Sequence, residues 1–237
     1  MAPTAAVILS GAASALPDLP DMPGMPDPPG MPDLPGPAGG DRTAPVLIAA
    51  DGGLAAAAAA GRRADHLVGD LDSADPDLVG AARAAGTVVH RFPADKDATD
   101  LELALELAVG LGVTVVTVVS GHGSRFDHLV AETMLLASPR WAALVLDAWY
   151  PPAHVVVARA GATTAVDARP GSLISLVPAH GPATVSTTGL SWPLDAGTLE
   201  AGSSRGVSNV AGGPVTVTVH AGTVLVIRPF ALEEQQP

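Results

Sequence analysis

The sequence predicts an α/β fold in which an N-terminal α/β/α domain with a mostly parallel sheet precedes a C-terminal all-β sandwich or barrel-like domain. Two patterns support this prediction. Up to about residue 150, short apolar or β-branched runs alternate with helix-compatible segments, which is typical of buried parallel strands joined by helices. After Pro151 and Pro152, short strand-like runs are separated by Gly or Pro and show no helical period. We therefore expect domains at residues 1–150 and 151–237.

The elements of the first domain follow from its apolar runs and helix start signals. Expected strands are 5–9, 46–50, 66–68, 87–91, 113–119 and 143–146, and expected helices are 54–60, 76–85, 100–109 and 125–137. Asp75 before Pro76 is an N-cap signal, and Thr99 with Glu102 fits a capping box. The alternation of strands and helices implies right-handed crossovers between parallel strands.

The second domain is expected to consist of short strands. These are 154–158, 163–166, 172–177, 183–187, 215–220 and 223–228. In the fifth of them, Val alternates with Thr and His. That period of two predicts an antiparallel sheet with one face in water.

A proline-rich insert interrupts the first domain. Residues 17–37 are a near-repeat of Pro, Asp, Gly, Met and Leu that holds nine of the 23 prolines. Proline lacks a backbone donor and the segment has no periodic apolar face, so we expect a mobile, disordered insert over residues 17–41. Such segments can bind partners as pre-extended ligands, but a tolerated insertion is the favoured interpretation.

The composition excludes several classes of function. Twelve Lys and Arg stand against 24 Asp and Glu, and the formal charge of −12 opposes binding to nucleic acid or anionic lipid. The absence of Cys excludes disulfides and thiolate metal sites. No apolar run approaches the roughly 18 residues of a membrane span, and the start of the chain lacks the basic residues of a secretory signal. We expect a soluble, cytoplasmic protein with no nucleic-acid or membrane partner.

Acidic residues follow four of the expected parallel strands. They are Asp51, Asp70, Asp72, Asp97, Asp100 and Asp127. The carboxyl ends of parallel strands meet at the edge where α/β folds bind ligands, so these carboxylates are expected to converge. Two carboxylates about 4 Å apart repel by roughly 4 kcal/mol at an effective dielectric constant of about 20, so several of them need a cation. With oxygen ligands and no Cys, Mg²⁺ is the expected ion.

Glycines and basic residues near these acids indicate a nucleotide–metal site. Glycines at 52, 53, 69, 121 and 123 would let backbone N–H groups approach a phosphate. Lys96, the only lysine, is expected either to balance the charge of Asp97 or, preferably, to contact phosphate. Arg125 is a candidate for neutralising a transferred phosphate, and His128 is expected to support the site rather than to bind metal.

The same residues belong to an ordered set of motifs. The set comprises ADGG (50–53), GDLDS (69–73), KDATD (96–100), RFDH (125–128), SLISLVP (172–178), TGLSWPL (188–194), SN (208–209) and GTVLVI (222–227). In this set the chain resembles the thiamine pyrophosphokinase family, from about residue 46 to residue 228. Each motif alone is weak, but the ordered set over two domains is specific.

The resemblance implies Mg²⁺-dependent transfer of a pyrophosphoryl group from ATP to the hydroxyl of thiamine, releasing AMP, in a homodimer with its active site at the subunit interface. It implies that Mg²⁺ is held by Asp70, Asp72 and Asp100, with Asp127 and Arg125 completing the catalytic set. The implied ATP contacts are Asp51, Ser73, Lys96, Asp97, Thr99, Arg125 and His128. In the second domain, which would bind thiamine and support dimerisation, Trp192 would stack on the cationic thiamine rings with Ser208 and Asn209 nearby.

Two other functions fit parts of the sequence. Asp70 and Asp72 also resemble the paired aspartates of haloacid-dehalogenase-type phosphohydrolases, in which the first Asp is a nucleophile. That interpretation needs a longer apolar strand before Asp70 and a lysine further along the chain than Lys96. A non-catalytic nucleotide-sensing scaffold would keep the acidic site and use the proline-rich insert for a partner. Such a sensor has no need of a thiamine-stacking Trp192.

Overall fold

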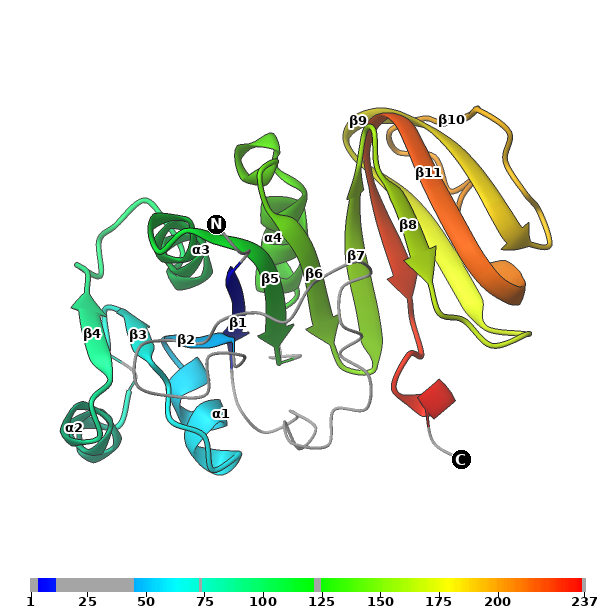
Figure 1. The fold of residues 1–237 in the computed structure, drawn as a ribbon. Helices are drawn as coiled ribbons and strands as arrows, with labels where there is room; N and C mark the ends of the chain where they lie inside the picture. The colour runs from blue at the N-terminus through cyan, green and yellow to red at the C-terminus, as the bar shows by residue number, and fades with distance from the viewer. Residues whose placement is uncertain (1–3, 12–44, 73, 122–124, 236–237) are drawn as a thin grey trace. The chain divides into compact units, whose positions relative to one another are not determined.

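The computed structural model describes residues 4–11, 45–72, 74–121 and 125–235, and the chain divides into two compact units (Figure 1). The first unit contains the described residues up to Phe126 together with Leu144–Leu146. The second contains Asp127–Ala143 and the residues from Asp147 onward. The proline-rich insert over residues 17–41 and Ser73 lie outside the described residues. The domain boundary expected near residue 150 stays a prediction.

Parallel strands and the helices between them make up the described part of the first unit. The strands are β1 (Thr4–Ser10), β2 (Val46–Ala50), β3 (His66–Gly69), β4 (Val88–Arg91) and β5 (Val113–Ser120), and the helices are α1 (Gly53–Ala59), α2 (Pro76–Ala84) and α3 (Asp100–Gly110). The strands lie in the order β5, β1, β2, β3, β4, and all these neighbours are parallel. Ser10 pairs with both Ala50 and Ser120, so these strands end at the same edge of the sheet. The predicted parallel sheet is confirmed.

The order of the strands creates a switch point next to β1. The chain steps from β1 to β2, β3 and β4 in one direction, and then returns to place β5 on the other side of β1. Right-handed crossovers therefore put α1 and α2 on one face of the sheet and α3 on the other, as Figure 1 shows. Ligands of open α/β sheets bind at the carboxyl edge near such a point.

Apolar strand residues and well-capped helices hold the first unit together. Ile8, Ile48 and Leu67 from three adjacent strands are fully buried. Both predicted caps are confirmed. The Asp75 side chain accepts from the Asp77 amide (2.9 Å), and the Thr99 hydroxyl accepts from the Glu102 amide (3.2 Å). The second cap fixes the start of α3 beside the carboxyl ends of the strands.

Most described elements of the second unit are strands. They are β6 (Val145–Tyr150), β7 (Ala153–Arg159), β8 (Thr163–Val166), β9 (Leu173–Leu190), β10 (Gly197–Leu199) and β11 (Asn209–Arg228), with helix α4 (Phe126–Ala137) and two 3₁₀ turns, Pro139–Trp141 and Glu233–Gln235. Elements α4 and β6 each include residues of both units. Ile174, Val185 and Val217 belong to a buried apolar cluster that β7, β8, β9, β10 and β11 share. The strand-rich second half predicted from the sequence is confirmed.

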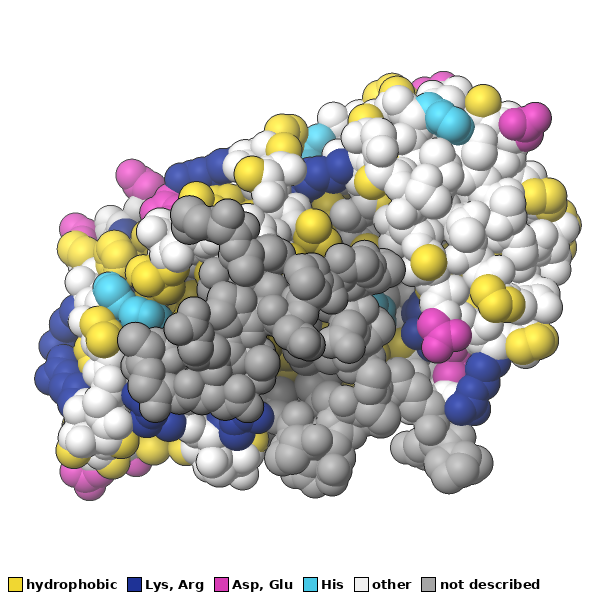
Figure 2. Space-filling view, viewed as in Figure 1, with side chains coloured by type: hydrophobic (Ala, Val, Ile, Leu, Met, Phe, Trp, Pro, Cys, Tyr) yellow, Lys and Arg dark blue, Asp and Glu magenta, His cyan; other side chains and the backbone are white. Residues whose placement is uncertain are grey.

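Two long strands replace four short ones. The expected strands 172–177, apart from its first residue, and 183–187 both lie in β9, and 215–220 and 223–228 both lie in β11. Pro and Gly interrupt the alternating pattern, but pairing continues through the interruption, for example between Ala179 and Thr223. The exposed face carries hydroxyls instead of charges, with Thr188 bonded to Thr216 at 2.7 Å. Figure 2 accordingly shows few charged side chains over β9 and β11.

The length and apolar character of a helix decide whether it can cross a bilayer. Within the described ranges, no helix is both long enough and apolar enough to span a membrane.

Candidate active site

Acidic residues of the first unit are held at the carboxyl edge of its sheet. Asp51 directly follows β2, where its amide donates to the Val68 carbonyl of β3 (2.9 Å) and its φ of 43° turns the chain into α1. The turn needs Gly53, because a Cβ there would lie 2.0 Å from the Leu9 carbonyl oxygen. The helix therefore starts against the backbone of β1, which fixes Asp51 at the edge.

Gly69, the last residue of β3, lies close to both Asp51 and Asp100. A Cβ at this position would lie 3.4 Å from Asp100 Oδ1 and 3.5 Å from Asp51 Cα, and its φ of 155° is one that side chains rarely adopt. Asp100 is the first residue of α3, and the Thr99 cap starts this helix beside the end of β3, so the Asp100 carboxylate lies next to the turn at Asp51. The predicted convergence holds for these acids.

Lys96 lies between two of the carboxylates. Its Nζ is 3.3 Å from Asp70 Oδ2 and 3.1 Å from Asp100 Oδ1, and only 13% of its side chain is exposed. Burial acts to lower the pKa of Lys96, but the hydrogen bonds and charges of Asp100 and Asp70 outweigh it and raise the pKa above its usual value. Lys96 thus stays cationic at neutral pH. Its partners are Asp70 and Asp100 instead of Asp97, the partner considered from the sequence.

The two bridged acids have opposite pKa shifts. Burial, together with the negative charges of Asp51 and Asp70, raises the pKa of Asp100 despite the nearby Lys96. The hydrogen bond from the Asp72 amide lowers the pKa of Asp70, and Lys96 lowers it further. The site therefore holds a readily ionised carboxylate next to one that resists ionisation, which is an environment that favours an additional cation.

The loop after β3 presents Asp72 to solvent. The Asp72 amide donates to Asp70 Oδ1 at 3.0 Å, and the Asp72 side chain is 68% exposed. Arg91, at the end of β4, donates from Nε to the main-chain oxygen of Asp70 at 3.2 Å and has a terminal nitrogen 4.0 Å from Asp72 Oδ1. Arg91 was not predicted as a site residue, because in the sequence it is only the last residue of an expected strand. A cation directly at the carboxyl end of a parallel strand was the available signal.

The other described residues of the predicted site lie near the starts of α3 and α4. Asp97 is exposed in the loop before α3, and Thr99 serves as the cap of that helix. Arg125 is exposed immediately before α4. Asp127 and His128 are exposed residues in the first turn of α4 and belong to the second unit. Their roles, and that of Ser73 outside the described residues, stay predictions.

The chemistry of the acidic cluster suits a hard divalent cation. Asp70, Asp72 and Asp100 offer carboxylate oxygens, which Mg²⁺ prefers. The ammonium of Lys96 lies between the carboxylates of Asp70 and Asp100 and reduces the repulsion between them. Among the residues the structure describes, no three His, Asp or Glu side chains are arranged as a ready-made metal cage. The donor types therefore fit Mg²⁺, although Lys96 and Arg91 provide the neutralising charge here.

The second unit carries a fixed loop with an exposed aromatic ring. The Trp192 amide donates to Asn209 Oδ1 (3.1 Å), and Asn209 Nδ2 donates back to the Trp192 carbonyl (2.8 Å). Trp192 is nevertheless 65% exposed, so it is not a core residue. Ser208, with a φ of 61°, donates its amide to Ser175 Oγ at 3.0 Å. The three residues predicted to bind thiamine are thus neighbours, with the ring of Trp192 open to solvent.

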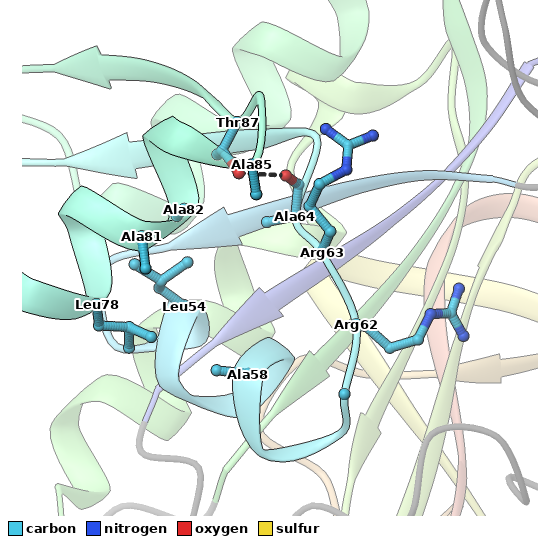
Figure 3. A pocket seen from close by; sticks show the side chains of 11 residues that line it. Leu54, Ala58, Arg62, Arg63, Ala64, Leu78, Ala81, Ala82, Ala85 and Thr87 are labelled. Carbon is cyan, nitrogen blue, oxygen red and sulfur yellow. Dashed lines mark hydrogen bonds between the residues drawn. The ribbon is translucent and has the colours of Figure 1, made fainter.

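A separate cavity of about 270 Å³ lies between α1 and α2 (Figure 3). Leu54, Leu78 and Ala81 line it together with Thr87, which donates its hydroxyl to the Ala64 carbonyl at 2.7 Å. The small alanine side chains of the two helices leave this space unfilled. Its lining is mainly apolar and lies near the starts of β3 and β4, so it is not part of the acidic cluster.

Comparison with known proteins identifies the family of both halves. The family profile described as thiamin pyrophosphokinase, catalytic domain, matches residues 42–144. The profile described as thiamin pyrophosphokinase, vitamin B1 binding domain, matches residues 163–224. The first match contains the acidic cluster, and the second contains Trp192 and Asn209. A search of curated proteins found no match.

Solved structures share the fold over nearly the whole chain. The thiamine pyrophosphokinase from Bacillus subtilis is 21% identical with a TM-score of 0.76, over 95% of this chain and 98% of that one. The protein from Geobacillus thermodenitrificans is 24% identical with a TM-score of 0.72, over 95% and 96%. Yeast thiamin pyrophosphokinase is 14% identical with a TM-score of 0.65, over 99% and 88%. With both of its profiles matched in order over more than half of its length, the chain belongs to the thiamin pyrophosphokinase family.

Proposed function

We propose that this chain transfers the pyrophosphoryl group of ATP to the hydroxyl of thiamine in a Mg²⁺-dependent reaction, giving thiamine diphosphate and AMP. As a member of its family the chain is an enzyme, a thiamine diphosphokinase. The observation that carries the detailed proposal is Lys96 held between Asp70 and Asp100 at the carboxyl edge of the sheet. A polyphosphate and its cation need both kinds of charge in one place.

The acidic cluster would hold the metal and the phosphates. Asp70, Asp72 and Asp100 would hold Mg²⁺, which when bound neutralises phosphate charge and orients the oxygens for in-line transfer. Lys96 supplies a fixed positive charge, because its raised pKa keeps it protonated. Asp51 adds negative charge next to Asp100, which would attract the cation. Asp97, Thr99, Arg125, Asp127, His128 and Ser73 are proposed to complete the contacts with ATP.

The exposed ring of Trp192 supports a thiamine site in the second unit. An indole face attracts a cationic ring such as the thiazolium of thiamine. The paired hydrogen bonds with Asn209 hold the loop in place before substrate arrives, so ligand binding does not have to order it. Ser208 and Asn209 are proposed to contact the same substrate.

The remaining parts of the proposal concern assembly and location. We propose a homodimer in the cytoplasm, with ATP and thiamine as its small-molecule partners. The net charge of −12 supports the further proposal that nucleic acid and membrane surfaces are not partners.

The test is to incubate the protein with ATP, Mg²⁺ and thiamine and to measure nucleotides and thiamine esters. Equal amounts of AMP and thiamine diphosphate, formed only with all three components and abolished by a chelator, are expected. Inorganic phosphate and ADP formed without thiamine would instead indicate a phosphohydrolase. Nucleotide binding without any turnover would indicate a sensing scaffold. Family membership gives no support to either alternative.

A further inference from the structure

Arg91 connects the end of β4 to the acidic loop of its neighbour β3. Its Nε donates to the main-chain oxygen of Asp70 at 3.2 Å, and a terminal nitrogen lies 4.0 Å from Asp72 Oδ1. The side chain is 64% exposed, and β4 is the last strand in the sheet order of this unit. A single guanidinium therefore spans the main chain of one acidic residue and the carboxylate of another.

The loop that Arg91 contacts, Asp70 to Asp72, has an unfavourable backbone conformation. Leu71, between the two acids, has a φ of 62°, in the left-handed region that residues other than Gly, Asn and Asp seldom occupy. Such a conformation persists only where the surroundings hold it. The Asp72 amide bonds to Asp70 Oδ1, and Lys96 bonds to Asp70 Oδ2. Those contacts hold the Asp70 side chain, whereas Arg91 holds its main chain.

We propose that Arg91 is a positioning residue that fixes the Asp70–Asp72 loop, so that both carboxylates stay presented at the carboxyl edge of the sheet. Its catalytic consequence rests on the proposed function, because only there are Asp70 and Asp72 metal ligands. Arg91 suits the task because its planar fork places two donors at a fixed angle, which the single ammonium of Lys does not. The main-chain hydrogen bond carries this role, since an exposed ion pair at 4.0 Å contributes little.

The chain offers a matched control at the other end of β3. Arg63 is also exposed and pairs with an acid next to the strand, with a terminal nitrogen 2.9 Å from Asp65 Oδ1. Asp65 precedes β3, whereas Asp70 follows it. Arg63→Ala therefore removes the same type of side chain as Arg91→Ala but leaves the contacts of the Asp70–Asp72 loop unchanged.

The experiment compares wild type, Arg91→Ala, Arg91→Lys and Arg63→Ala. Amide hydrogen exchange of Asp72, measured by NMR in metal-free protein, is expected to accelerate about tenfold or more in Arg91→Ala, because loss of a hydrogen bond to a charged donor frees the loop. Arg91→Lys keeps the charge and is expected to restore only part of the protection. Arg63→Ala should match wild type. Unchanged exchange in Arg91→Ala, or equal acceleration in Arg63→Ala, overturns the proposal.

Two further measurements connect the loop to function. Affinity for Mn²⁺, followed by electron paramagnetic resonance as a stand-in for Mg²⁺, should weaken about tenfold in Arg91→Ala, a loss typical of residues that orient metal ligands. The kcat for thiamine diphosphate formation should fall while the KM for thiamine stays within about twofold, the pattern of a residue remote from that substrate. Lost activity with unchanged Asp72 exchange would mean that Arg91 contacts substrate directly, and would overturn the positioning role. An inactive wild type would overturn the proposed function, but the exchange data would still decide the role of Arg91.

Discussion

The ammonium of Lys96 lies 3.1 Å from the carboxylate of Asp100, four residues further along the chain, at the first turn of α3. Even with this partner, burial and the neighbouring acids keep the pKa of Asp100 above its ordinary value. The folded environment therefore makes ionisation of Asp100 less favourable than in the unfolded chain, so its ionisation works against folding. Asp70, whose pKa is lowered, has the opposite effect.

The first prediction is that Asp100→Asn and Asp70→Asn change stability in opposite directions. A raised folded pKa makes the folded state lose stability as pH rises from the ordinary Asp value through the folded value, so Asp100→Asn should be the more stable protein at pH 7. A lowered pKa gives stability above the ordinary value that is lost as pH falls through the folded one, so Asp70→Asn should be less stable at pH 7. Urea unfolding at pH 7 and pH 3 measures both, and shifts of the same sign at pH 7 would contradict the prediction.

A second prediction concerns the exposed acid of the cluster. Asp72→Asn should lower kcat by about 100-fold or more, as expected when a group that stabilises transferred charge is removed. Since the side chain is exposed, the free energy of unfolding should change by no more than about 0.5 kcal/mol. Asp77→Asn in the first turn of α2 is the matched control and should be fully active. Near-normal Mg²⁺-dependent turnover of Asp72→Asn would refute the proposed role.

Trp192 allows a third prediction, on substrate selectivity. Trp192→Ala should raise the KM for thiamine by about 3- to 30-fold, the range of a cation–π contact, and leave the KM for ATP within about twofold. Phe230→Ala removes another partly exposed aromatic ring of the second unit and should change neither value. Steady-state kinetics with each substrate varied in turn is the measurement. Equal effects of Trp192→Ala on both substrates would reject stacking on thiamine.

The fourth prediction uses a histidine pair on neighbouring strands. His66 Nδ1 and His90 Nε2 are 3.0 Å apart, and burial, then His90, lower the pKa of His66 while Asp65 opposes them. The unfolded chain therefore binds more protons just below the ordinary His pKa, so unfolding free energy falls as pH drops below about 6.5. His66→Gln should flatten this decline between pH 7.5 and 5.5 in urea unfolding, whereas His220→Gln should not. An unchanged decline in His66→Gln would disprove the role of the pair.

A fifth prediction addresses the proline-rich insert. Deleting residues 17–37 leaves 12 of the 33 residues between Gly11 and Pro45, which is about the length that a connection between parallel strands requires. The shortened protein should keep its melting temperature and its activity. Loss of folded protein, seen by circular dichroism, would show that the segment contributes to the fold.

Much of the fold could be predicted because apolar patterns depend on local burial. Strands β2 and β8 match their expected bounds, and the caps at Asp75 and Thr99 were visible as short-range signals. The lengths of β9 and β11 could not be predicted. Gly and Pro in the sequence predict the end of a strand, whereas the pairing between β9 and β11 continues through these residues.

The site shows the same division between local and distant information. The gathering of Asp51, Asp70 and Asp100 follows from parallel topology and could be predicted. The partners of Lys96 could not, because they depend on how the start of α3 lies against the end of β3. Arg91 was not predicted because its hydrogen bond is to the main-chain oxygen of Asp70 in the loop after β3, and only its position at the end of β4 indicated a place at the site.

The central position of β1 has a consequence for synthesis of the protein. This earliest described strand lies between β2 and β5, so one of its edges has no partner until residues 113–120 have been made. At about 5 to 20 residues per second, translation from β1 to β5 takes roughly 5 to 20 s. During that interval the apolar stretch around Ile8 is an open template for other nascent chains. Ribosomes that stall before residue 120 should therefore release fragments that aggregate or recruit chaperones.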